Sequence, residues 1–188
     1  IPNISGMASK ESIPQSINPN HNSVLLNMDT GEIVEHWLEI SSRTQEDEST
    51  LVHVRSIRGL EHNTQYAVAF RGLSDSNGVE IEPFTGFKAL RDGLPTDNQQ
   101  IEDSRAGFEV MFAELLEIDF QRHNLTSAWW FHTASSQSIT EDIISMRNDA
   151  MLRLGEGGIG CNVTSVEENY GGDNTTFRMI SGTITTPH

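Results

Sequence analysis

The stretch Gln65-Tyr66-Ala67-Val68-Ala69-Phe70-Arg71 is typical of a β-strand and lies between two turns. Successive side chains on a strand point to opposite faces, so Tyr66, Val68 and Phe70 share one face. We predict that these three side chains belong to the core. Asp75-Ser76-Asn77-Gly78 follows and supplies residues that tolerate a positive φ, which predicts a tight turn.

Further strands are expected on the N-terminal side of this stretch. Residues 24–27 and 32–37 predict a hairpin around the turn Asp29-Thr30-Gly31, and residues 51–55 predict another strand. Residues 1–22 contain Pro and Gly without a sustained period, so we expect an extended lead-in there. The short strands from residue 23 onward have the spacing of a β-sandwich.

The period changes to that of a helix further along the chain. In the segment 99–118, Phe108, Met111, Phe112 and Leu115 fall at i, i+3, i+4 and i+7. This spacing predicts an amphipathic helix whose apolar stripe packs on the β layer.

Three more elements are expected toward the C-terminus. Residues 128–131 predict a short buried strand, and Ser138-Ile139-Thr140-Glu141 is a capping box that opens a second helix, which Gly155 stops. Residues 161–167 and 175–184 are rich in β-branched side chains and predict a terminal hairpin.

The charge of the chain limits its partners. Its 188 residues carry a net charge of −15, a surface that repels phosphate backbones and anionic lipid, so we expect no nucleic-acid binding. No stretch is apolar enough for membrane insertion. The chain starts at Ile1 without a leader and ends abruptly at His188, which predicts a fragment of a larger protein. Its expected partners are other protein chains or the remainder of its own precursor.

Glycosylation sequons indicate a secreted, extracellular or cell-surface glycoprotein. Of these, Asn162 is the least suited acceptor because it lies in a strand-like run. The single Cys161 has no internal partner, so it is buried, free or paired outside this chain, and burial is favoured. The sequons are at Asn3, Asn124, Asn162 and Asn174.

Oxygen-rich turns offer the only candidates for a cofactor, a calcium ion held by carboxylates and carbonyls. Tight turns require the same residue types, and the plain turn is the favoured interpretation. The histidines and Cys161 show no zinc-site spacing. The calcium candidates are Asp29, Asp75, Asn77 and Asp173.

The pair Trp129-Trp130 suggests an exposed aromatic platform. Because neighbours on a strand point to opposite faces, we expect one indole to be buried and at most one to be free for binding. Core packing is the favoured role. No residue of the chain is predicted to be catalytic.

Two segments resemble a known family. "LVHVRSIRGLEHNTQYAVAFRGLSDSNGVEIEP", residues 51–83, resembles the final strands of an Ig-like domain of bacterial surface and secreted proteins. "AGFEVMFAELLEIDFQRHNLTSAWWFHTAS", residues 106–135, is similar to the N-terminal region of bacterial extracellular lipases. In that family the nucleophile lies in a later α/β-hydrolase domain with a Gly-x-Ser-x-Gly elbow, which this chain lacks. The resemblance therefore implies an accessory region without an active site.

Together these features predict a mostly β chain with helices, of the α+β class. An Ig-like β-sandwich core over residues 23–92 follows the lead-in and is elaborated by a helix, strand and helix over 93–160 and a β-hairpin over 161–188. The expected function is that of a non-catalytic extracellular module in adhesion, assembly or an envelope. The alternatives are an accessory region of a secreted lipase or esterase and a calcium-dependent binding module.

Overall fold

The structure is a computed structural model that describes residues 2–3, 7–18, 20–41, 51–75, 77–172 and 175–184. The chain divides into two compact units, Ile1–Ser136 and Gln137–His188. It is an α+β protein built from small antiparallel sheets and helices, as the sequence predicts.

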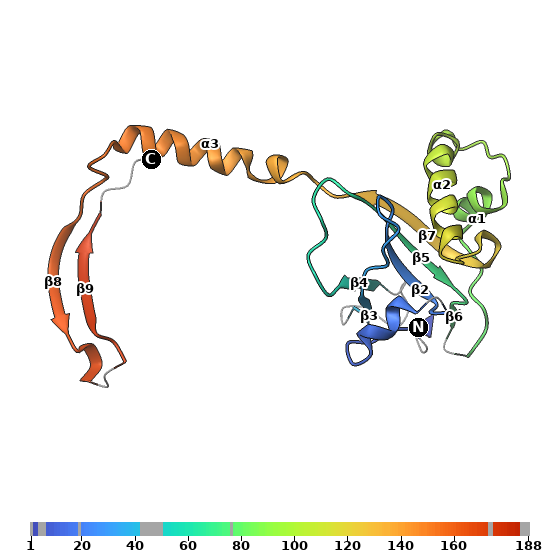
Figure 1. Ribbon diagram of the computed structural model, residues 1–188, viewed down its shortest axis with the longest axis horizontal. Helices are drawn as coiled ribbons and strands as arrows, with labels where there is room; N and C mark the ends of the chain where they lie inside the picture. The colour runs from blue at the N-terminus through green and yellow to red at the C-terminus, as the bar shows by residue number, and fades with distance from the viewer. Residues whose placement is uncertain are drawn as a thin grey trace. The chain divides into compact units, whose positions relative to one another are not determined.

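A three-stranded antiparallel sheet forms the middle of the first unit (Figure 1). Its strands are β2 (Ser23–Asn27), β5 (Gln65–Arg71) and β7 (Leu125–His132), in the order β2-β5-β7. The central strand β5 is the predicted one, and it has a different layer of the protein on each of its faces.

Two helices, α1 (Thr85–Asp92) and α2 (Gln99–Glu117), cover one face of this sheet (Figure 1). The Asn98 side chain caps α2 by accepting a hydrogen bond from the Gln100 N–H. The small side chains of Ala67 and Ala69 face the helices. The core on this side also contains Val24, Leu26, Met28, Met111, Phe112, Leu115, Phe120, Leu125 and Ala128.

The hairpin of β3 (His36–Ile40) and β4 (Val52–Ser56) packs on the other face of the sheet. Tyr66, Val68 and Phe70 are buried there, which confirms the prediction from their alternation. Their neighbours in this second cluster include Leu25, Val34 and Leu38. A two-residue pairing of β1 (Pro2–Asn3) with β6 (Ser74–Asp75) completes the strands of the unit.

The second unit is a helix followed by a hairpin. The helix α3 (Ser136–Leu154) precedes β8 (Asn162–Glu168) and β9 (Arg178–Thr183), which pair antiparallel. The predicted terminal hairpin is confirmed, but α3 begins two residues before the predicted capping box at Ser138. No described residue from 137 onward is buried.

The helix prediction for residues 99–118 is confirmed, because α2 buries Met111, Phe112 and Leu115. The sequence did not predict α1, where Pro83 and Gly86 disguise the helix and Phe87 packs against Phe108 with ring centroids 6.3 Å apart. Gly93, with φ +69°, ends this helix in the left-handed conformation.

Two predictions at the N-terminal end need correction. The expected hairpin of residues 24–27 and 32–37 is present only in part: Leu26 bridges Ile33 and the Val34 N–H donates to the Leu25 carbonyl, whereas the regular ladders join β2 to β5 and β3 to β4. Residues 7–18 are not an extended lead-in, because they contain the 3-10 turn η1 (Ile13–Ile17) and bury Met7 and Ala8. Non-local packing decides both cases.

A buried hydrogen-bonded cluster fastens η1 to β2 and β3. The His36 Nδ1 lies 2.9 Å from the Val34 carbonyl, which only accepts, so Nδ1 carries the proton and Nε2 accepts from the Ser23 hydroxyl at 2.9 Å. The backbone N–H of His36 donates to the Ser16 hydroxyl, and His21 Nδ1 lies 3.2 Å from the Ser23 hydroxyl.

Acid should loosen this cluster. Burial lowers the pKa of His36, and the hydrogen bond of His36 to the Val34 carbonyl opposes this shift in part. Burial is also the main cause that lowers the pKa of His21, and the positive charge of Arg71 adds to it. The unfolded chain therefore binds protons first, and stability is lost as the pH falls below about 6.5.

We predict that His36→Gln flattens the pH dependence of stability. Its unfolding free energy should fall less steeply than that of the wild type between pH about 6.5 and 4.5, by up to about 1.4 kcal/mol per pH unit. Urea unfolding at several pH values measures the slope. The exposed His123→Gln is the matched control, and equal slopes for His36→Gln and the wild type would contradict the prediction.

Candidate functional site

The free edge of β7 is the principal candidate site. In the register of the sheet, His132 pairs with Gln65, and the Thr133 N–H donates to the Thr64 carbonyl at 3.0 Å. Because backbone groups alternate in direction along an antiparallel strand, Ala128, Trp130 and His132 direct their N–H and C=O groups away from β5.

These outward backbone groups have no protein partner in the part of the chain that the structure describes. Natural edge strands are usually protected by charged residues or Pro. Residues 123–140 contain no Asp, Glu, Lys, Arg or Pro, although charged residues make up 21% of the chain. The β7 edge is therefore open to pairing with another strand.

A groove with aromatic side chains lies beside this edge, on the face covered by β3 and β4. Its cavity has a volume of about 240 Å³ and is lined by β4 and by the side chains of Leu60, Trp129 and Phe131, among others. The Phe131 ring stacks on Tyr66 at 5.8 Å, and the Trp129 ring lies 5.9 Å from that of Phe70. The sheet thus holds both aromatic walls in place.

Trp130 lies on the opposite face, over α2. It pairs with Ala67, and a Cβ added to Gly107 would lie 2.7 Å from its Cζ2 atom. Only a glycine lets the helix and the indole approach this closely. Gly107 therefore sets the position of Trp130 along the edge.

The structure corrects the prediction for the two tryptophans. They point to opposite faces as expected, but neither is buried: Trp129 is 40% exposed and Trp130 37% exposed. The reason is that β7 is an edge strand, so the layers on both faces end beside it. Sequence periodicity gives the direction of a side chain but not the position of its strand in the sheet.

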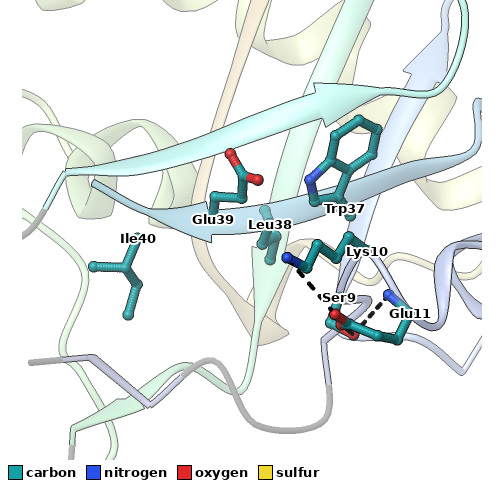
Figure 2. Close-up of a pocket in the computed structure, with 7 residues that line it drawn as sticks. All are labelled: Ser9, Lys10, Glu11, Trp37, Leu38, Glu39 and Ile40. Carbon is teal, nitrogen blue, oxygen red and sulfur yellow. Dashed lines mark hydrogen bonds and ion pairs between the residues drawn. The ribbon is translucent and has the colours of Figure 1, made fainter. Parts of the chain in front are cut away.

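A second hollow lies beside β3, with a volume of about 290 Å³ (Figure 2). It brings Trp37 and Glu39 near Lys10 and Glu11. The Trp37 indole N–H is the main cause that lowers the pKa of Glu39, and Arg55 is the second. The Trp37 Nε1 atom nevertheless lies outside hydrogen-bond geometry with every described residue. Lys10 and Glu11 point along the surface and pair with each other, so no set of groups converges on a ligand position (Figure 2).

The predicted calcium ligands do not form a site in the described residues. The Asp75 carboxylate accepts the N–H groups of Asn77 at 2.8 Å and Val79 at 2.9 Å, and the bond from Val79 is the main cause that lowers the pKa of Asp75. Asp29 accepts from the Gln65 N–H at 3.3 Å. The Asp75 carboxylate thus holds its own turn, the Asp29 carboxylate ties its turn to β5, and Asp173 lies outside the described residues. No group of three or more His, Cys, Asp or Glu that could hold a metal occurs where the chain is described.

The sequon residues differ in what the structure shows. Asn124 is exposed at the end of η2 (Arg122–Asn124), and Asn162 is exposed at the start of β8, although its strand is as predicted. The side chain of Asn3 and all of Asn174 lie outside the described residues. Cys161 is exposed, so the prediction of a buried thiol is wrong, because the second unit has no described core to bury it.

The Ser23–His36 pair has the short hydroxyl–imidazole distance of a nucleophile and its base. Both side chains are buried, at 1% and 0% exposure, and the group that orients His36 is the Val34 carbonyl. A substrate cannot reach the hydroxyl, so the pair is structural. This pair was not predicted, because packing brings together residues from two strands and a turn.

The chain was compared with protein-family models, curated proteins and solved structures, and none of them matches it. The site must therefore be interpreted from its own geometry. No helix in the described part of the chain is both long and apolar enough to span a membrane.

We predict that Gly107→Ala displaces the Trp130 indole. The new methyl group would overlap the ring, so we expect a loss of about 1–3 kcal/mol in unfolding free energy and a red-shifted tryptophan emission as the ring moves into water. Gly157→Ala, which has open space around it, is the control. A Gly107→Ala variant with unchanged stability and emission would show that Trp130 does not rest on α2.

Proposed function

We propose that the chain is a non-catalytic interaction module that binds an extended polypeptide segment by adding it as a strand at β7. The observation that carries this proposal is the unpaired, uncharged β7 edge with an aromatic side chain on each face. In strand addition, backbone hydrogen bonds supply affinity and pockets for alternate side chains supply specificity.

The site offers both parts of such recognition. Ala128, Trp130 and His132 present outward N–H and C=O groups, and a segment paired with them places alternate side chains in the groove beside Trp129 and over Trp130. Covering the exposed part of each indole, about 100 Å², contributes about 2 kcal/mol before the cost of association.

The proposal also includes an Ig-like sandwich fold for the first unit and secretion of the protein. The packing of the β3–β4 hairpin on the β2-β5-β7 sheet supports a sandwich of the Ig-like kind. Secretion rests on the sequons, of which Asn124 and Asn162 are exposed. The intact mass of the native protein before and after deglycosylation tests their occupancy. The resemblance to secreted lipases fits the same role, that of an accessory region.

The binding proposal predicts that the full chain selects strand-forming peptides from a phage library of random ten-residue sequences. Selected peptides should alternate apolar and polar residues and should bind Trp130→Lys at least about tenfold more weakly than the wild type, because a charge then blocks the edge. Fluorescence anisotropy of the labelled peptides measures the dissociation constants.

Two further variants make this test specific. His132→Lys adds a charge at the same edge without removing a packed ring and should also weaken binding. Phe84→Lys makes the matched change at an aromatic residue that is 83% exposed and distant in the sequence, and it should bind as the wild type does. Equal binding by all the variants, or no selected peptide from a chain that is monomeric, would reject strand addition at β7.

The absence of catalysis is tested separately. We expect the purified chain to hydrolyse p-nitrophenyl butyrate no faster than buffer, because Ser23 and the two histidines near its hydroxyl, His21 and His36, are all buried. Turnover that Ser23→Ala or His36→Gln abolished, with the fold retained by circular dichroism, would contradict this expectation and assign an esterase activity to the chain.

A further inference from the structure

We propose that the partner of the β7 edge is a second copy of this chain, which pairs antiparallel about a two-fold axis at Trp130. This inference rests on the proposed strand addition and names its partner. It makes one continuous sheet, in the order β2-β5-β7-β7-β5-β2, from the open edges of two molecules.

The backbone of β7 is complementary to itself in this register. The outward groups belong to Ala128, Trp130 and His132, which are spaced evenly around Trp130. With Trp130 opposite Trp130 of the second copy, Ala128 lies opposite His132 of the second copy and His132 opposite Ala128 of the second copy. Each of these three positions is a hydrogen-bonded pair, so every outward N–H and C=O over this stretch has a partner.

The side chains are also complementary. On the groove face, Trp129 lies opposite Phe131 of the second copy, and the symmetry repeats this pair. On the helix face, the two Trp130 indoles lie opposite each other. Aromatic pairs across antiparallel strands stabilise sheets, and each copy supplies half of every pair.

Charge selects this edge for contact between copies. Each chain carries a net charge of −15, so two copies repel each other over most of their surfaces. Residues 123–140 carry no Asp, Glu, Lys or Arg, so pairing along β7 places no like-charged strand residues opposite each other. Association should therefore strengthen as added salt screens the long-range repulsion.

Sedimentation equilibrium of the full chain tests the proposal. We expect a monomer–dimer equilibrium whose dissociation constant falls as ionic strength rises. Trp130→Lys places two ammonium groups opposite each other and should raise the dissociation constant at least about tenfold, and His132→Lys should raise it without loss of a packed ring. Phe84→Lys, the control, should change it less than about twofold.

A cross-link tests the register. In a Cys161→Ser background, Trp130→Cys should form a covalent dimer on oxidation, because opposite Cα atoms of such a pair lie about 5.5 Å apart, within the range of a disulfide. Phe84→Cys in the same background should remain monomeric. Equal cross-linking by both variants would overturn the register.

The second unit supplies the competing outcome. Ile143 of α3 is 62% exposed, so apolar contact through α3 is another route to a dimer. If Ile143→Lys dissociates the dimer and Trp130→Lys does not, the proposal is overturned. A chain that stays monomeric but binds selected peptides at β7 overturns the second-copy inference and leaves the proposed function standing. A monomer that binds no peptide rejects both.

Discussion

The structure depends on the burial of β5 between two different layers. On one face Ala67 and Ala69 present only methyl groups, and on the other Tyr66, Val68 and Phe70 fill the space under the β3–β4 hairpin. A strand with small and large side chains in strict alternation can support helices at close range on one side and a hairpin on the other. Reversing the register by one residue would put the large side chains against α2, so the pairing is strongly specified.

This constraint also explains the geometry of the β7 edge. The alanine face brings α2 so close to the sheet that only Gly107 fits beneath Trp130. The aromatic face positions Phe131 against Tyr66 and Trp129 against Phe70. The exposed aromatic side chains are therefore held by the core rather than by a loop, and a rigid edge loses less conformational entropy when it binds.

Local periodicity correctly predicted the helices and strands that form because of the pattern within their own residues. The alternation in β5, the helical spacing of Met111, Phe112 and Leu115, and the β-branched strands of the terminal hairpin are all present. The sequence did not predict which strands pair, because β2 joins β5 from about forty residues away and a local turn signal at Asp29 favoured its neighbour. The sequence predicted one property of the candidate site and missed another. The opposite directions of Trp129 and Trp130 follow from the strand period and were predicted. The exposure of both indoles follows from the edge position of β7 in the sheet and was not.

The two edges of the central sheet differ: the β2 edge is covered by the segment that follows it, whereas the β7 edge is open. On the β2 edge, the chain turns back on itself: the Val34 N–H donates to the Leu25 carbonyl at 2.7 Å, and the Asn27 N–H donates to the Glu32 carbonyl at 2.9 Å. The segment that follows β2 thus pairs with the outward Leu25 carbonyl and Asn27 N–H, and the His21–Ser23–His36 cluster lies at the start of the strand. The β7 edge has no such cover among the described residues and carries no charge to repel a partner. Since unpaired edges favour association and proteins commonly protect them, a fold that covers one edge and leaves the other open retains β7 as the edge available for pairing.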